Sequence, residues 1–157
     1  MAITIVSGDI LNADTKYIAH QCNCVTDRAE GLAKKIFSVY DNIYDKRTIA
    51  TTAGTISMSH YYDKTSNRPS KPIVINIFAQ IYPGKTKYKS GSDSATKRAE
   101  YFESCLMEIL KIADLTSIAF PYNIGCGLAG GDSKIYNDML NVFANKTAAK
   151  VYIYKLT

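Results

Sequence analysis

Short apolar runs alternate with segments of helical periodicity along the chain, and this alternation is the feature that most constrains its fold. The run Ile73–Ala79 is almost continuously apolar, which is typical of a buried central strand. The segment Thr55–Tyr61 alternates between apolar and polar residues, which predicts an edge strand. Four further runs predict strands at Ile3–Val6, Tyr17–Cys22, Ser117–Phe120 and Val151–Tyr154.

Three segments between these runs predict helices, because apolar residues recur on one face of each. Asp27 is the expected N-cap of a helix over Arg28–Tyr40. A second helix is expected to begin at Asp93 or Ser94, and a third at Asp132. The residues expected on the inward faces of these two helices are Phe102, Leu106, Ile109 and Leu110, and Ile135, Met139, Leu140 and Phe143.

Strands that alternate with helices over short connections indicate an α/β protein, a three-layer α/β/α sandwich with a mixed, largely parallel sheet. The 157 residues suit one domain, residues 1–157, that buries roughly 70% of the surface of its unfolded chain. In such sheets, ligands bind beyond the carboxyl ends of the strands. The loops Gly8–Asp9, Asn23–Gly31 and Asn123–Asp132 all leave strand ends, so we expect them to open on one crevice.

The charge of the chain favours an anionic ligand, because 19 Lys and Arg against 14 Asp and Glu give a net charge of +5. The basic cluster Lys85–Lys97 is either a solvated loop or a surface that faces a nucleic acid. The chain has no run of about 18 apolar residues and no signal-peptide pattern, so neither a membrane span nor export is expected. We therefore expect a cytoplasmic protein, or an intracellular one with access to the nucleus, whose four cysteines are reduced thiols.

The segment Phe120–Asp132 is the strongest candidate for a binding site. It follows an apolar run, precedes a helix and carries four glycines, Gly125, Gly127, Gly130 and Gly131. Glycine allows the backbone to approach a ligand closely, and free N–H groups before a helix suit a phosphate or pyrophosphate. No Gly-Lys-Ser/Thr follows, so the segment is not a P-loop. The alternative is a flexible connection that binds nothing.

Polar side chains at the end of a predicted apolar strand form a second candidate. His20, Gln21 and Asn23 would be costly if they were merely buried there, and they could serve ribose hydroxyls or a phosphate. A structural role for His20 is the alternative. Asp9, which follows the first strand, could accept a hydrogen bond from an exocyclic amine such as adenine N6, or it could form an Asx-turn.

The sequence does not indicate a metal site. Cys22 and Cys24 have no second cysteine pair at zinc spacing. No clustered carboxylates suggest a bound cation, and no Ser-His-Asp triad can be assembled.

Taken together, these segments resemble the macrodomain superfamily over essentially the entire chain. Within that superfamily, the chain is most similar to the ADP-ribose-1″-phosphate phosphatase branch. The residues that carry the resemblance are Ile18-Ala-His-Gln-Cys-Asn-Cys24, Gly31-Leu-Ala33, Tyr82-Pro-Gly-Lys85 and Ile124-Gly-Cys-Gly-Leu-Ala-Gly-Gly-Asp132.

This resemblance implies a binding site for ADP-ribose or ADP-ribose 1″-phosphate. Asp9 and Ile10 would hold adenine, and Tyr154 would stack on it. Asn23 would contact the distal ribose. Phosphate and further ribose contacts would come from two loops, with Gly31 and Leu32 in one and Ile124, Gly125, Cys126, Gly127 and Leu128 in the other.

The resemblance also implies an activity, the hydrolysis of ADP-ribose 1″-phosphate to ADP-ribose and phosphate. His20 and Asp132 are the candidates for the acid–base steps. The family generally needs no metal or other cofactor, and we expect a monomer that does not bind membranes. Three alternatives stay open: removal of ADP-ribose from protein or nucleic acid, a reader that binds ADP-ribose without turnover, and a generic nucleotide-binding module.

Overall fold

The computed structural model describes residues 3–25, 35–36, 40–44, 52–63, 68–69, 72–87, 90–127 and 129–156. The helices whose bounds lie within these residues are the 3-10 helix η1 (Ile10–Asn12) and the α-helices α2 (Ala95–Ile109) and α3 (Ser133–Lys146). Within these residues, no helix combines the length and the apolar character needed to cross a lipid bilayer. Its strands are β1 (Ile3–Ser7), β2 (Tyr17–Asn23), β3 (Tyr40–Tyr44), β4 (Ile56–Asp63), β5 (Arg68–Pro69), β6 (Ile73–Gln80), β7 (Ser117–Pro121) and β8 (Lys150–Lys155).

The strands form a mixed sheet in the order β1-β8-β7-β2-β6-β4-β3, and β5 pairs with β4 outside this path. The pairs β1–β8, β8–β7, β7–β2 and β2–β6 are parallel, whereas β4 runs antiparallel to β6, β3 and β5. The register places Ile18 of β2 between Val74 of β6 and Ala119 of β7. The sequence-based expectation of a mixed, largely parallel sheet is confirmed.

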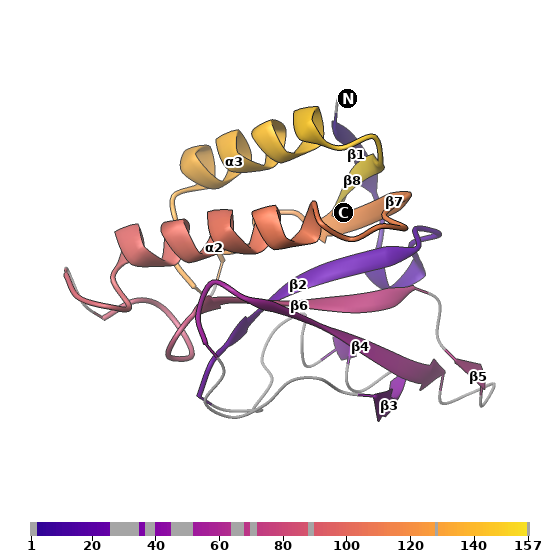
Figure 1. Cartoon of the computed structure of the whole chain (residues 1–157), viewed down its shortest axis with the longest axis horizontal. Helices are drawn as coiled ribbons and strands as arrows, with labels where there is room; N and C mark the ends of the chain where they lie inside the picture. The colour runs from indigo at the N-terminus through magenta and orange to yellow at the C-terminus, as the bar shows by residue number, and fades with distance from the viewer. Residues whose placement is uncertain are drawn as a thin grey trace.

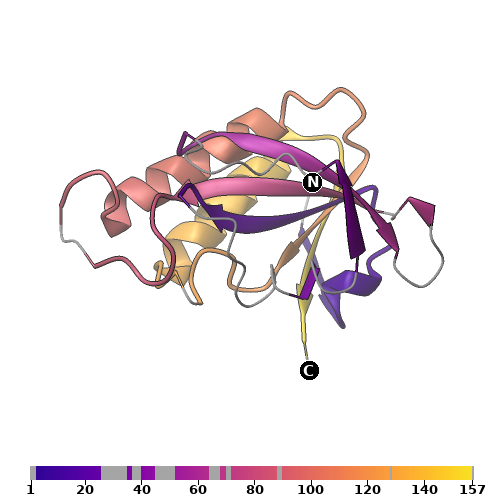
Figure 2. The ribbon, with the colours of Figure 1, turned by 90° about the horizontal axis from the view of Figure 1, so that it is seen from below.

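The helices α2 and α3 lie together on one side of the sheet (Figure 1), and they lie behind the strands when the molecule is seen from below (Figure 2). Phe102 of α2 and Phe143 of α3 share the main core with alternate strand residues such as Ile75. Residues between these along the strands face the other side of the sheet. There a second apolar cluster joins Ile10, Ala13, Ile18, Ile36, Val74 and Ala119.

The helices begin at the residues that capping rules predict. Ser94 and Asp132 cap α2 and α3 by accepting hydrogen bonds from backbone N–H groups of the first turn. The prediction that Ile135 lies on the inward face of α3 is wrong, because its side chain is 48% exposed. Tyr136, which is 3% exposed, packs in the core instead. It precedes Leu140 by four residues and so shares its helix face.

The edge of the sheet differs from the expectation. β4 is not an edge strand, because β3 pairs with it on the side away from β6. Tyr40 therefore begins a strand, and the helix expected over 28–40 ends before it; of residues 28–39, the structure describes only 35–36, which are helical. The short strand β5 lies inside the polar stretch 63–71, for which the sequence, with Pro69, indicates a loop. Periodicity did not reveal these strands, because both owe their pairing to β4.

Candidate functional site

Parallel neighbouring strands bring their carboxyl ends to one edge of the sheet. β1, β8, β7, β2 and β6 follow one another in this way, so the segments that leave them lie side by side. The described parts of the three loops predicted to share a crevice therefore meet here. Three backbone hydrogen bonds join the segments along the edge, from Gly8 N–H to Lys155 O (2.9 Å), from Tyr122 N–H to Tyr154 O (2.9 Å) and from Cys24 N–H to Ile81 O (3.0 Å).

The residues predicted to hold adenine come together at the β1–β8 end of this edge. Asp9 Oδ1 accepts a hydrogen bond from Leu11 N–H at 3.0 Å and caps η1, as the Asx-turn alternative has it. Its second oxygen, Oδ2, accepts from no donor among the residues described. Ile10 is 4% exposed, and Tyr154 packs against the same apolar cluster. Burial raises the pKa of Tyr154, so its ring is neutral at physiological pH.

The glycine-rich segment after β7 has a backbone with several positive φ values and close contacts at its glycines. Asn123, Gly125 and Gly130 have φ values of 61°, 77° and 77°. A Cβ atom on Gly125 would lie 2.4 Å from the Tyr136 ring, and one on Gly131 would lie 2.5 Å from Gly125 O. Gly131 N–H donates to Gly125 O at 2.9 Å, which closes the segment on itself. Glycine is therefore required at positions 125 and 131.

Two backbone donors of this segment are unused. Within the part of the chain that the structure describes, the N–H groups of Gly125 and Gly127 donate to no protein acceptor. Cys126 N–H, which lies between them, donates to Asn123 O at 2.8 Å. Gly127 is exposed, and a Cβ built on it would meet nothing within 4 Å. Free N–H groups shortly before a helix N-terminus suit the oxygens of a phosphate.

Asn23 ends β2 at an irregularity in the sheet. Cys22 pairs with Phe78 of β6, but Asn23 pairs with Gln80, so the register shifts between them. The Asn23 side chain is 9% exposed, and its Oδ1 accepts Val25 N–H at 3.0 Å. Asn23, the residue predicted to contact the distal ribose, thus shapes the start of the segment that follows β2.

His20 lies within β2 in a buried polar network. Its ring is 1% exposed, and its Nε2 lies 2.7 Å from Asn76 Oδ1. Asn76 Nδ2 donates to the hydroxyls of Ser57 and Ser59 at 3.2 and 2.6 Å, so its Oδ1 is the acceptor and Nε2 carries the proton. In the neutral imidazole, Nδ1 is then unprotonated. This arrangement favours the structural alternative for His20.

Asp132 lies where the glycine-rich segment enters α3. Its Oδ1 accepts the N–H groups of Lys134 and Ile135 at 2.9 and 3.4 Å. Over the described ranges, nothing donates to its Oδ2, and the residue is exposed. His20 shares the strand face of Ile18, which is the face turned away from α3. The structure thus places the two predicted catalytic residues in different layers of the molecule.

Three of the predicted ligand contacts, Gly31, Leu32 and Leu128, lie outside the described residues. Two predicted contacts of the glycine-rich segment besides Gly125 and Gly127 are described. Ile124 is a core residue with 5% exposure, and Cys126 packs against the main core.

The surroundings of Cys24 and Cys126 favour the protonated thiol. Burial, and to a lesser extent the charge of Asp132, raises the pKa of Cys126. Burial, followed by the charge of Asp93, raises the pKa of Cys24 to about 11. The reactive form of cysteine is the thiolate, which neither residue supplies at pH 7. Among the described residues, no group of three His, Cys, Asp or Glu side chains could hold a metal ion.

A buried ion pair beside the glycine-rich segment was not predicted from the sequence. Arg98 and Asp93 are each 2% exposed, with Nε–Oδ1 and Nη2–Oδ2 distances of 3.0 and 2.7 Å. Asp93 also accepts the N–H groups of Ile81 and Tyr82 at 2.7 and 3.2 Å, so the pair fixes the segment after β6. The sequence did contain an indication that Arg98 is buried. It precedes Phe102 by four residues and so shares the inward face of α2.

Gln21, one of the polar residues singled out in the sequence, reaches beneath the glycine-rich segment. Its Nε2 donates to Gln80 Oε1 at 2.7 Å, and Gln80 Nε2 donates to Tyr82 O at 2.9 Å. Gln21 Oε1 is buried and has no hydrogen-bond partner among the described residues. A Cβ on Gly125 would lie 3.0 Å from this oxygen. The two glutamines therefore couple the carboxyl ends of β2 and β6 to the site.

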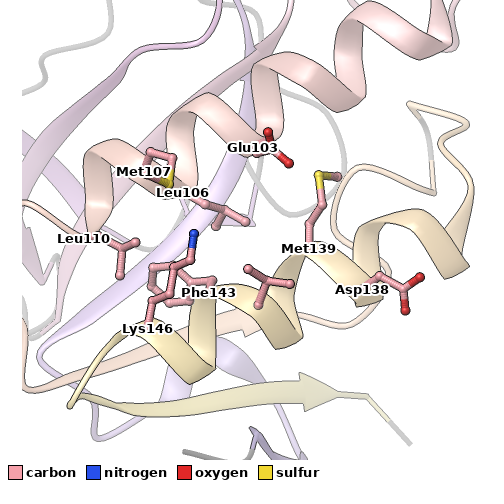
Figure 3. A pocket seen from close by; sticks show the side chains of 9 residues that line it. Glu103, Leu106, Met107, Leu110, Asp138, Met139, Phe143 and Lys146 are labelled. Atoms are coloured by element: carbon pink, nitrogen blue, oxygen red, sulfur yellow. The ribbon is translucent and has the colours of Figure 1, made fainter.

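A small cavity of about 190 Å³ lies at the rim of this edge and is lined by Tyr82, Pro83, Lys85, Lys87, Asp93 and Arg98. Another cavity, of about 400 Å³, lies between α2 and α3 (Figure 3). Its lining is largely apolar, with Met107, Met139 and Phe143 among its residues, and it includes none of the predicted contacts. The polar groups that could orient a ligand gather at the strand ends, so we assign the candidate site to that edge.

No family model matches the chain. A curated protein of enterobacteria phage T4, described as an uncharacterised 17.5 kDa protein of the tk-vs intergenic region, is 25% identical over 151 residues. The match covers 93% of this chain and 92% of the phage protein.

Solved structures with this fold include macrodomains. A Bacteroides thetaiotaomicron protein of unknown function matches with a TM-score of 0.73 and 22% identity, over 99% of this chain and 98% of its own. The macrodomain of Mycobacterium tuberculosis DarG matches with a TM-score of 0.66 and 19% identity, over 98% of both chains. A variant Oceanobacillus iheyensis macrodomain solved with ADPR matches with a TM-score of 0.67 and 17% identity, over 97% of this chain and 83% of its own. The chain therefore has the macrodomain fold.

Proposed function

We propose that the chain binds ADP-ribose along the carboxyl edge of its sheet and hydrolyses ADP-ribose 1″-phosphate to ADP-ribose and phosphate. The observation that carries this proposal is the pair of unused N–H groups at Gly125 and Gly127, in a segment whose backbone has positive φ at Asn123 and Gly125 before α3. The Oceanobacillus iheyensis macrodomain solved with ADPR supports the choice of ligand. The net charge of +5 favours an anionic ligand of this kind.

The ligand spans the edge from one end to the other. Adenine stacks on the neutral ring of Tyr154 and donates from N6 to Asp9 Oδ2, the oxygen that η1 leaves unused. The phosphates accept from Gly125 and Gly127. The distal ribose lies toward Asn23, which ends the neighbouring strand.

The hydrolytic step assigns a proton acceptor to Asp132. Its Oδ2 takes a proton from a water molecule whose oxygen bonds to the terminal phosphorus. The bond from phosphorus to the C1″ oxygen breaks, and that oxygen takes a proton from solvent water as ADP-ribose leaves, while Asp132 returns its proton to solvent. The free N–H groups stabilise the charge that gathers on the phosphoryl oxygens. His20 is the second candidate. Because its Nε2 proton faces Asn76, it could stabilise the charge on the phosphoryl oxygens only as the imidazolium, which also carries a proton on Nδ1.

Replacement of Asp132 by Asn tests the step, because Asn also caps helices and so preserves the start of α3. With a chelator present throughout, we expect Asp132→Asn to lower phosphate release from ADP-ribose 1″-phosphate by about 100-fold or more. Calorimetry should give unchanged affinity for ADP-ribose. Asp138→Asn, an exposed α3 carboxylate paired with Lys134, is the matched control and should keep full turnover. Equal losses of turnover and affinity in Asp132→Asn would remove the catalytic assignment.

A second candidate function is removal of ADP-ribose from nucleic acid. Lys85 and Lys87 are exposed beside Tyr82 at the rim cavity, and no carboxylate in the described ranges pairs with them. Such cations can bind backbone phosphates, which makes binding depend steeply on salt. The rate of ADP-ribose release from a modified oligonucleotide should then fall with salt, and Lys87→Gln should reduce that slope by about one. A rate independent of salt excludes this substrate.

A further inference from the structure

The guanidinium of Arg98 joins three segments that are distant in the sequence. Its Nε and Nη2 donate to the two carboxylate oxygens of Asp93, as described above. Nη2 also donates to Tyr82 O at 3.1 Å, and Nη1 donates to Gly84 O at 2.7 Å. The remaining contact, from Nη1 to Ala129 O at 3.3 Å, reaches the glycine-rich segment. Every nitrogen of the guanidinium is thus engaged.

Burial makes these contacts hard to replace. Arg98 and Asp93 are each 2% exposed, so removal of either side chain leaves a buried charge without its paired hydrogen bonds. A lysine at position 98 could keep the charge opposite Asp93. It has no planar fork, so it could not serve the carboxylate and three carbonyls together.

A second contact holds the same two segments together. A Cβ on Gly130 would lie 2.6 Å from Cγ of Lys85, so the aliphatic part of this side chain packs directly on the backbone of the glycine-rich segment. The internal bonds of that segment, from Gly131 to Gly125 and from Gly130 to Gly127, only close it on itself. Among the described residues, the hydrogen bond that joins this segment to α2 and to the segment after β6 comes from Arg98.

We propose that Arg98 is a positioning residue for ligand binding, which it supports by holding the glycine-rich segment where Gly125 and Gly127 N–H face the ligand phosphates. The proposal rests on the proposed function for the identity of the ligand. Arg98 touches no ligand itself, and it acts through Ala129 O. The segment is then formed before the ligand arrives, which reduces the ordering cost of binding.

The test compares variants of the full chain. Asp93→Asn/Arg98→Gln removes both charges together and leaves no buried charge unpaired, and Arg98→Lys keeps the ion pair. Ile109→Ala, at a fully buried position near the other end of α2, is the control for lost stability alone. We expect kcat/KM for ADP-ribose 1″-phosphate to fall about 100-fold in both Arg98 variants and to stay unchanged in Ile109→Ala.

Amide NMR signals of the ligand-free protein separate positioning from stability. The Gly125 and Gly127 signals should shift or broaden in both Arg98 variants, but they should stay in place in Ile109→Ala. Arg98→Lys should be thermally more stable than Asp93→Asn/Arg98→Gln, but its kcat/KM should stay as low as that of the double variant. The proposal is overturned if the glycine signals are unchanged, or if stability and kcat/KM recover together. If the wild type fails to bind ADP-ribose, the proposed function fails, while the glycine signals still decide the role of Arg98.

Discussion

Tyr136 shows how a single core residue supports the site. Its ring is 3% exposed and lies directly beneath Gly125 and Gly131, where a Cβ atom on either glycine would meet it. Phe102 of α2 contacts the ring with centroids 4.8 Å apart. Burial, with a smaller contribution from Cys126, raises the pKa of Tyr136 to about 12. The folded protein therefore strongly favours the neutral phenol.

This pKa predicts a loss of stability in alkali. The folded value of about 12 exceeds the ordinary value of 10.0, so Tyr136 stabilises the fold fully below pH 10 and loses this effect as the pH rises through 12. Urea unfolding should be measured at about pH 8 and about pH 11. The decrease in unfolding free energy between these two pH values should be smaller in Tyr136→Phe than in the wild type. The exposed Tyr122→Phe serves as the control. Equal losses in wild type and Tyr136→Phe would contradict the assignment.

Local rules account for the individual residues that the sequence predicted well. Asp9 follows a strand and caps the next turn, and Asp132 precedes a helix and caps it, so each could be placed from its immediate neighbours. The hydrogen bond between Gln21 and Gln80 joins residues 59 positions apart, and nothing in either local sequence specifies the partner. The contact of Arg98 with Ala129, 31 positions away, was missed for the same reason.

At the scale of elements, hydrophobic periodicity predicted the buried strands and the starts of both long helices. β6 and β7 were found because they are continuously apolar, as strands covered on both faces must be. β3 has the mixed sequence Tyr-Asp-Asn-Ile-Tyr and was missed, because it is defined by its pairing with β4. The glycine-rich segment was recognised as a candidate site, but its unused N–H groups could be seen only in three dimensions.

A pair of alanine substitutions tests the geometry of the glycine-rich segment. Gly125 and Gly91 both have positive φ values, of 77° and 92°, but only at Gly125 would a Cβ meet another atom, the Tyr136 ring at 2.4 Å. Gly91→Ala should cost about 1–2 kcal/mol of unfolding free energy, the cost of the backbone conformation alone. Gly125→Ala should cost more and should also abolish ADP-ribose binding in calorimetry.

Gly91→Ala is the control for binding, and its affinity for ADP-ribose should equal that of the wild type. Equal stability losses in the two variants, or retained binding in Gly125→Ala, would show that the segment is less constrained than its backbone indicates.

At the scale of the whole molecule, the sheet is packed on both faces and leaves its carboxyl edge as the place where polar groups converge. Five parallel strands deliver their loops to this edge, so one extended ligand can touch segments from both ends of the chain. The cavity between α2 and α3 (Figure 3) is a competing site with a different chemistry, since its lining is largely apolar. Whether the proposed ligand binds at the edge or in this cavity is therefore the central question.

An NMR titration of the labelled protein with ADP-ribose answers that question most directly. We expect saturable shifts of the backbone signals of Asp9, Gly125, Gly127 and Tyr154, with the signals of Met107 and Val142 in the α2–α3 cavity unchanged. Shifts confined to the α2–α3 cavity, or no shifts at all, would contradict the assignment of the site to the carboxyl edge of the sheet.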